Sequence, residues 1–168
     1  MQRTLVDYLT TTQSVFESLI SHSDVVLRLR EDGRSGGGYF CLANEVGQPL
    51  LISKVGEPDP QKLGKYLEFC QEKAARLASH AEHRLSRSSR NPALLQFGGA
   101  VRGTTHILSF SGLPELLDEI LTVLTALETN ELGFADAVML ATSENWNDFH
   151  RLVPEIYAFR HPKAGTHT

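Results

Sequence analysis

The sequence has few of the features that would assign it to a special class of protein. Only two of its 168 residues are cysteines, Cys41 and Cys70, which is too few for a disulfide framework. We expect both to be small buried apolar groups in a reducing compartment, with a single bridge left open as an alternative. No run approaches the ~20 apolar residues of a membrane span, and the N-terminus has no long apolar core typical of a signal peptide. The expected location is therefore cytoplasmic.

An excess of positive charge is also missing. Lysine and arginine number 16 against 20 acidic residues, which gives a formal net charge of −4 and argues against nucleic acid as the main partner. The run of Arg84, Arg87 and Arg90 could bind phosphate, but a solvated loop is the favoured interpretation in an acidic chain. The composition is that of a soluble globular protein, and the length suits one domain, 1–168.

Sequence motifs of common catalytic and nucleotide-binding sites are absent. The three glycines at 36–38 are not followed by the Gly-Lys-Ser/Thr of a P-loop, so we expect a flexible turn there. Ser109 and Ser111 do not stand in a GxSxG context. Glu115 and Asp118 lie three residues apart, and acidic residues favoured at a helix start explain them without catalysis. We therefore assign no catalytic residue.

The apolar pattern predicts an α+β chain. Helices are expected at 4–20, 61–83, 113–127 and 146–159, with a break or kink at Pro154. Strands are expected at 25–29, 39–43, 49–55 and 106–110. The segment 134–141 is apolar and could be either a strand or a helix.

The stretch 96–119 organises the rest of the chain. Gly98 and Gly99 allow a positive φ or the close approach of another segment. Residues 102–105 predict a turn, and 106–110 a short strand that ends at Ser111-Gly112. Pro114 then fits the first turn of an acidic helix.

This order of elements resembles the GlcG/HbpS-like family, which includes the haem-binding HbpS and the C-terminal domain of PduO-type proteins. The matching residues are Asn44-Glu45-Val46-Gly47, 50–54, Lys73-Ala74, Gly98-Gly99, Ser111-Gly112 and Asp118. The resemblance covers 39–125, which we take as the family core, and leaves 131–168 as an additional C-terminal segment. The chain departs from the family pattern at Asn44, where Asp is usual, at Lys54, where Arg is common, and at His106 and Ser109, where glycines are usual.

The resemblance implies a profilin-like α/β sandwich, in which helices pack on an antiparallel sheet of about five strands. It also implies a small organic ligand, with haem as one candidate cofactor. The ligand-binding residues that it indicates are Lys73, Gly98, Gly99, His106, His22 and Asp118. His106 is the first candidate for an axial ligand of haem and His22 the second, while Lys73 would pair with a propionate.

Simpler interpretations stay open beside these roles. His106 could be a hydrogen-bonded histidine on an exposed sheet face, and Lys73 a solvated lysine without an acidic partner on its own helix. His80 and His83 could share one helix face as two metal ligands. Glu82 is expected to point elsewhere and no third ligand is evident, so we assign no metal site.

Three classes of function follow from these patterns. A small-molecule or tetrapyrrole-binding module ranks first. A non-catalytic, dimeric interaction protein ranks second, with Trp146, Phe149 and Tyr157 as its surface. An enzyme ranks last, since no catalytic constellation is visible. The leucine-rich helices offer more apolar surface than one sheet needs, so we also predict a homo-oligomer, most simply a two-fold dimer.

Overall fold

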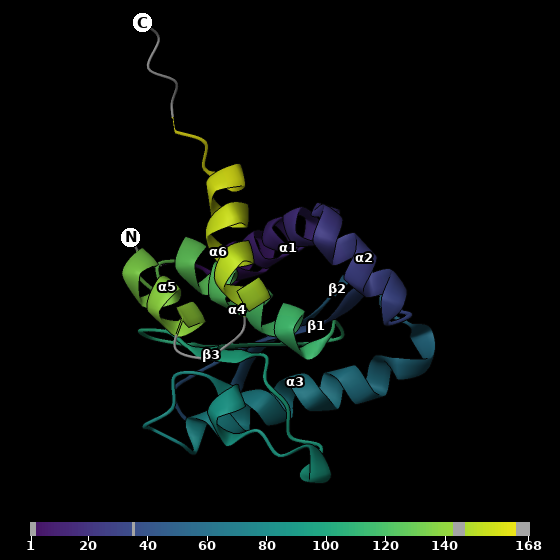
Figure 1. Ribbon diagram of the computed structural model, residues 1–168. Helices are drawn as coiled ribbons and strands as arrows, with labels where there is room; N and C mark the ends of the chain where they lie inside the picture. Colours follow the sequence, from purple (N-terminus) through teal and green to yellow (C-terminus); the bar gives the residue numbers. More distant parts are fainter. Residues whose placement is uncertain (1–2, 35, 143–146, 164–168) are drawn as a thin grey trace, which may run out of the picture.

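The computed structural model describes residues 3–34, 36–142 and 147–163, and within them six α-helices pack on a four-stranded antiparallel sheet (Figure 1). This arrangement confirms the predicted α+β class. The elements in chain order are α1 (Leu5–Ser21), α2 (Ser23–Glu31), β1 (Gly37–Ala43), β2 (Pro49–Gly56), α3 (Leu63–Ala78), β3 (Ala100–Arg102), β4 (Ile107–Ser111), α4 (Glu115–Glu128), α5 (Phe134–Thr142) and α6 (Asn147–Arg160).

The sheet has the order β2-β1-β4-β3, and every neighbouring pair is antiparallel. Successive side chains of a strand point to opposite faces, so each strand contributes to two separate clusters. Phe40 and Phe110 lie on one face and belong to the larger cluster, while Cys41 and Ile107 lie on the other. Both faces of the sheet are therefore covered.

The helices lie in layers on these two faces (Figure 1). Helix α3 covers the Cys41 face, with Cys70, Ala74 and Leu77 packed against the strands. Helices α1 and α4 cover the other face, α2 packs on α1, and α6 packs on α4. Cys41 and Cys70 are both free thiols and both buried, as the sequence predicts.

The predicted strand at 25–29 is wrong, because this segment forms the helix α2. Helix α1 ends at Ser21. The next residue is His22, whose ring nitrogen accepts a hydrogen bond from Asp24 N–H (3.3 Å) and so caps α2. Val25 and Leu29, four residues apart, are buried, while Leu27 between them is 56% exposed. This is the spacing of a helix face, and it leaves four strands in the described sheet instead of about five.

Other boundaries differ less. Asp59 caps a short 3-10 turn that starts at Pro60, and the helix that follows ends at Ala78 and does not reach 83. The ambiguous segment 134–141 is helical. Of the two alternatives predicted at Pro154, a break is wrong, because α6 continues through this residue to Arg160. Trp146 lies outside the described residues. None of the described helices is both long and apolar enough to cross a membrane.

Candidate functional site

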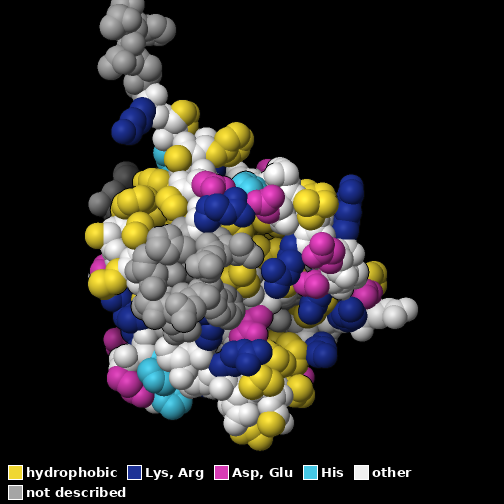
Figure 2. Space-filling view, in the orientation of Figure 1, with side chains coloured by type: hydrophobic (Ala, Val, Ile, Leu, Met, Phe, Trp, Pro, Cys, Tyr) yellow, Lys and Arg dark blue, Asp and Glu magenta, His cyan; other side chains and the backbone are white. Residues whose placement is uncertain are grey.

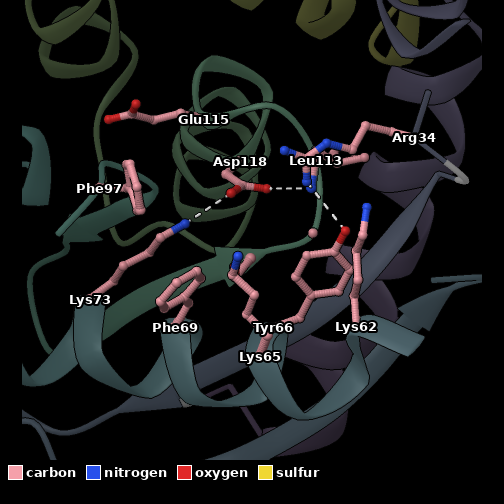
Figure 3. Close-up of a pocket in the computed structure, with 12 residues that line it drawn as sticks. Arg34, Lys62, Lys65, Tyr66, Phe69, Lys73, Phe97, Leu113, Glu115 and Asp118 are labelled. Atoms are coloured by element: carbon pink, nitrogen blue, oxygen red, sulfur yellow. Dashed lines mark hydrogen bonds and ion pairs between the residues drawn. The ribbon is translucent and has the colours of Figure 1, made fainter. Parts of the chain in front are cut away.

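A cavity of about 310 Å³ opens beside the first half of α3 and the start of α4 (Figure 3). Its walls come from α3, from α4, from the segment that joins β4 to α4, and from Arg34 in the loop after α2. The lining residues are Arg34, Lys62, Lys65, Tyr66, Phe69, Lys73, Phe97, Ser111, Gly112, Leu113, Glu115 and Asp118.

A buried ion pair joins the two helices at this cavity. Lys73 Nζ of α3 lies 2.9 Å from Asp118 Oδ2 of α4, and it also donates to the carbonyl of Phe110 (2.8 Å). The other carboxylate oxygen of Asp118 accepts from Leu113 N–H (2.9 Å). Both side chains of the pair are 3% exposed. Burial raises the pKa of Asp118 to about 6, and the attraction of Lys73 opposes this rise.

Aromatic rings and cations share the remaining wall. Phe69 and Phe97 meet edge to face with ring centroids 5.8 Å apart, and Lys65 Nζ lies 5.4 Å from the Phe69 centroid. Arg34 donates to the hydroxyl of Tyr66 (3.2 Å). Figure 3 shows these side chains directed toward the space in front of Asp118.

The charge of the cavity wall is positive. Four cationic side chains and two carboxylates line it, a formal difference of +2 in a chain whose net charge is −4. Asp118 is already paired with Lys73. Arg34 and Lys65 form no ion pair at contact distance with any acidic side chain that the structure describes, so they can still pair with an anion, although Arg34 is close enough to Asp118 to lower its pKa.

The second carboxylate of the wall, Glu115, is bound by two groups that do not line the cavity. It accepts from Gly98 N–H (2.7 Å) and pairs with Arg90 Nε (2.8 Å). Arg87 in the same basic run is buried and pairs with Glu119 (2.9 Å). The interpretation of this run as a solvated loop is therefore wrong for Arg87, because α4 supplies carboxylates that sequence spacing does not reveal.

The ion pair between Lys73 and Asp118 leaves no room for a side chain at Gly99. Its φ of +119° lies in the region that favours glycine, and an added Cβ would stand 2.7 Å from Lys73 Nζ and 2.9 Å from Asp118 Cβ. Gly98 and Gly99 therefore lie in one place with Lys73 and Asp118, four of the six predicted ligand-binding residues.

The other two predicted residues lie elsewhere. His106 precedes β4, at the strand end opposite Ser111, and pairs with Glu131 (2.7 Å). His22 lies between α1 and α2, with Nε2 3.2 Å from Glu155 of α6. The structure thus separates both histidines from Lys73, which is itself buried and not a solvated lysine.

His106 belongs to a second polar cluster, which is built around the buried carboxylate of Glu131. One oxygen of Glu131 accepts from Tyr8 OH (2.5 Å) and Thr105 Oγ1 (2.6 Å), and the other accepts from Thr105 N–H (2.7 Å). Burial opposes ionisation of Glu131, but the hydrogen bonds from Thr105, Tyr8 and His106 outweigh it and lower its pKa to about 2. Burial and the neighbouring carboxylate raise the pKa of Tyr8 to about 12.

Sequence inspection missed most of the cavity wall. One signal was present: Lys62, Tyr66, Phe69 and Lys73 follow one another at spacings of four, three and four residues, so they form a single stripe that starts at the N-cap of α3 and continues along the helix. A mixed stripe of cations and aromatic residues is unusual for a purely solvated helix face. Arg34 had no such signal, because it enters from a glycine-rich loop.

Comparisons with known proteins give one structural similarity. No family model matches the sequence, and no curated protein matches it. The structure is similar to the crystal structure of Klebsiella pneumoniae protein ORFY, of the family DUF336, with a TM-score of 0.42 and 16% identity over 77% of this chain and 93% of that chain. DUF336 corresponds to the GlcG/HbpS-like family that the motifs resemble. A TM-score of this size does not decide whether two chains share a fold, so the fold class rests on the sheet and helices themselves.

Proposed function

We propose that the protein binds a small organic anion with a flat apolar part in the cavity between α3 and α4. The observation that carries this proposal is the unneutralised charge of Arg34 and Lys65 beside the buried Lys73–Asp118 pair. The cavity volume of about 310 Å³ falls at the lower end of the range of known ligand pockets, about 300–1,000 Å³.

Each part of the wall has a role in this proposal. The guanidinium of Arg34 can bind a carboxylate or phosphate through two parallel hydrogen bonds, and Lys65 adds a second positive charge. Phe69 and Phe97 offer ring faces and edges to the apolar part of the ligand. Lys73 is held by Asp118 and Phe110, so it offers no free donor, and its charge is balanced by Asp118.

Haem is a less suitable ligand for this cavity than a smaller anion. No histidine is among the residues that line it, and the two candidate axial ligands, His106 and His22, are engaged by Glu131 and Glu155. We therefore place the ligand among aromatic or heteroaromatic carboxylates and phosphates and retain haem as a ligand to be tested.

A titration series tests the proposal. We would measure binding of aromatic carboxylates and their neutral amides by calorimetry, after native mass spectrometry of the purified protein for a retained ligand. We expect saturable binding of at least one carboxylate, no binding of its amide, and a loss of about 1–3 kcal/mol in Arg34→Gln and Lys65→Ala. Lys54→Ala, on the exposed part of β2, is the charge-matched control and should bind normally.

Two results would contradict the proposal. The first is the absence of saturable binding across the panel, and the second is equal affinity in the wild type and both cavity variants. Ferric haem belongs in the same series. A Soret shift that is lost in His106→Ala but retained in Arg34→Gln would move the ligand site away from this cavity.

Assembly into a homo-oligomer is a separate proposal. Phe134, Met139 and Phe159 are 47%, 58% and 78% exposed on α5 and α6, and Figure 2 shows apolar side chains on this part of the surface. Val153 and Ile156 of α6 are instead buried in the core, so they are not part of an exposed surface. Light scattering should give more than the single-chain mass of 18.6 kDa at micromolar concentration, and the single-chain mass would refute assembly.

A further inference from the structure

The turn that follows α3 brings together three side chains that bind transition metals. His83 N–H donates to the carbonyl of His80 (3.0 Å), which closes the turn directly after the helix. His80 Nδ1 lies 3.4 Å from Glu82 Oε1, and His83 Nε2 lies 3.5 Å from the same oxygen. We infer that these three residues form a binding site for Zn²⁺, separate from the cavity at Lys73.

The separations of the ligand atoms suit a tetrahedral ion. Zinc–nitrogen and zinc–oxygen bonds of about 2.0–2.1 Å place neighbouring ligand atoms about 3.3–3.4 Å apart. Two of the three separations in the turn are within about 0.2 Å of this value, and all three ligand atoms lie within 4.8 Å of one another. Two imidazoles and one carboxylate are a known zinc ligand set, and they leave a fourth position for water.

The backbone of the turn is fixed in advance by one arginine. Arg102 of β3 donates from Nε to the carbonyl of His83 (3.1 Å) and from Nη2 to that of His80 (3.1 Å). The same guanidinium reaches the carbonyl of Leu77 in the last turn of α3. These bonds use only main-chain oxygens, so they fix the backbone of the turn and leave the imidazole nitrogens and the carboxylate to a metal ion.

One side-chain movement completes the site. The two imidazole rings are stacked, with centroids 4.8 Å apart and planes 21° apart, and stacked rings cannot both direct a lone pair at one ion. His80 is 41% exposed and Glu82 is 68% exposed, so both can rotate freely, whereas His83 is 23% exposed and stays in place. Zn²⁺ binding therefore separates the rings by turning His80 toward Glu82 and His83.

Calorimetric titration of the full chain with Zn²⁺ tests the site, with Co²⁺ absorption as a second readout of tetrahedral coordination. We expect one equivalent to bind. Loss of an outer-shell partner alone costs about 10–100-fold in metal affinity, so His80→Ala and His83→Ala should each cost at least that much. Glu82→Gln should also weaken binding, because it removes the charge. His22→Ala changes a histidine–glutamate pair elsewhere and is the matched control.

The results with these variants show whether Zn²⁺ binds at this turn, at another histidine or in the cavity. Unchanged affinity in His80→Ala and His83→Ala, or loss of the tight equivalent in His22→Ala, would overturn the assignment, as would the absence of saturable binding. Circular dichroism of each variant shows that the fold is kept, which is expected first for His80→Ala and Glu82→Gln, whose side chains are 41% and 68% exposed. Arg34→Gln should bind Zn²⁺ normally whether or not the cavity binds an anion.

Discussion

The pKa values of two buried carboxylates in this protein are shifted in opposite directions. Asp118 receives one backbone N–H and one ammonium group, and its burial raises the pKa to about 6. Glu131 is also buried, but hydrogen bonds from Thr105, Tyr8 and His106 overcome the cost of burial and lower its pKa to about 2. The depth of burial and the number of hydrogen-bond donors around each carboxylate together set the direction of the shift.

This difference distinguishes the Glu131 cluster, which has a structural role, from the Asp118 pair, which adjoins the candidate binding site. The Glu131 cluster connects α1, through Tyr8, to the β3–β4 turn and to the end of α4. Both carboxylate oxygens of Glu131 already accept hydrogen bonds within the protein. The Asp118 pair has fewer donors and adjoins an open cavity with unneutralised cations. A carboxylate that can change charge near neutral pH beside such a cavity is typical of functional sites.

The largest expected effect comes from breaking the pair at the cavity. Lys73→Met removes the cation and leaves Asp118 buried without its partner, so the free energy of unfolding should fall by about 3–5 kcal/mol. Urea denaturation at pH 7.5 measures this loss. The double variant Lys73→Met/Asp118→Asn should recover part of it, because no uncompensated charge remains. A loss below about 1 kcal/mol in the single variant would contradict the prediction and show that Asp118 takes up a proton when its partner is removed.

The next effect concerns two neighbouring glycines. Gly99→Ala combines a φ of +119° with a Cβ 2.7 Å from Lys73 Nζ and should cost about 1–3 kcal/mol. Gly98→Ala is the matched control, since it has no such φ and its nearest contact is the Glu115 carboxylate at 3.1 Å. Thermal unfolding of both variants compares them. Equal losses would mean that the Lys73–Asp118 pair does not need the space at Gly99.

The sequence predicted this part of the molecule better than the rest. The Gly-Gly turn, Lys73 and Asp118 each stood in a short motif, so a local pattern marked them even though their contact spans 45 residues. The hairpin and the two longest helices inside 39–125 were also visible as periodic apolar residues. The segment from Val25 to Leu29 was predicted as a strand and is helical, because four apolar residues around Arg28 fit a strand as well as one helix turn.

The contacts of the Glu131 cluster could not be predicted from the sequence, for a physical reason. Glu131 follows α4 and meets His106 across 25 residues and Tyr8 across 123. Neither contact has a sequence spacing that a helix or a hairpin would impose. His80, Glu82 and His83 were close in sequence, but the expected helix extended through them. Because α3 ends at Ala78, the turn brings Glu82 toward both imidazoles, and the expectation that it points elsewhere is wrong.

The third prediction concerns acid stability. The pKa of Glu131 in the folded chain lies below its ordinary value of 4.5, so its stabilising contribution is complete above about pH 4.5 and is lost as the pH falls toward 2. Glu131→Gln should lower the free energy of unfolding by about 1–3 kcal/mol at pH 7 and flatten its decline below pH 5. Urea midpoints between pH 7 and pH 3 measure both effects. An unchanged acid slope in the variant would assign the decline to other carboxylates.

The smallest effect is a pH dependence of anion binding at the cavity. Because burial raises the pKa of Asp118 to about 6, acidification from pH 7.5 to 5.5 protonates this carboxylate and removes one negative charge from the wall. An anion should therefore bind more tightly at pH 5.5, by about 1 kcal/mol or less for a charge several ångströms away. An aromatic sulfonate is the suitable probe, since it stays ionised throughout. Asp118→Asn is the control: it should bind the sulfonate with a nearly flat pH profile, and a profile as steep as that of the wild type would show that another group controls the binding.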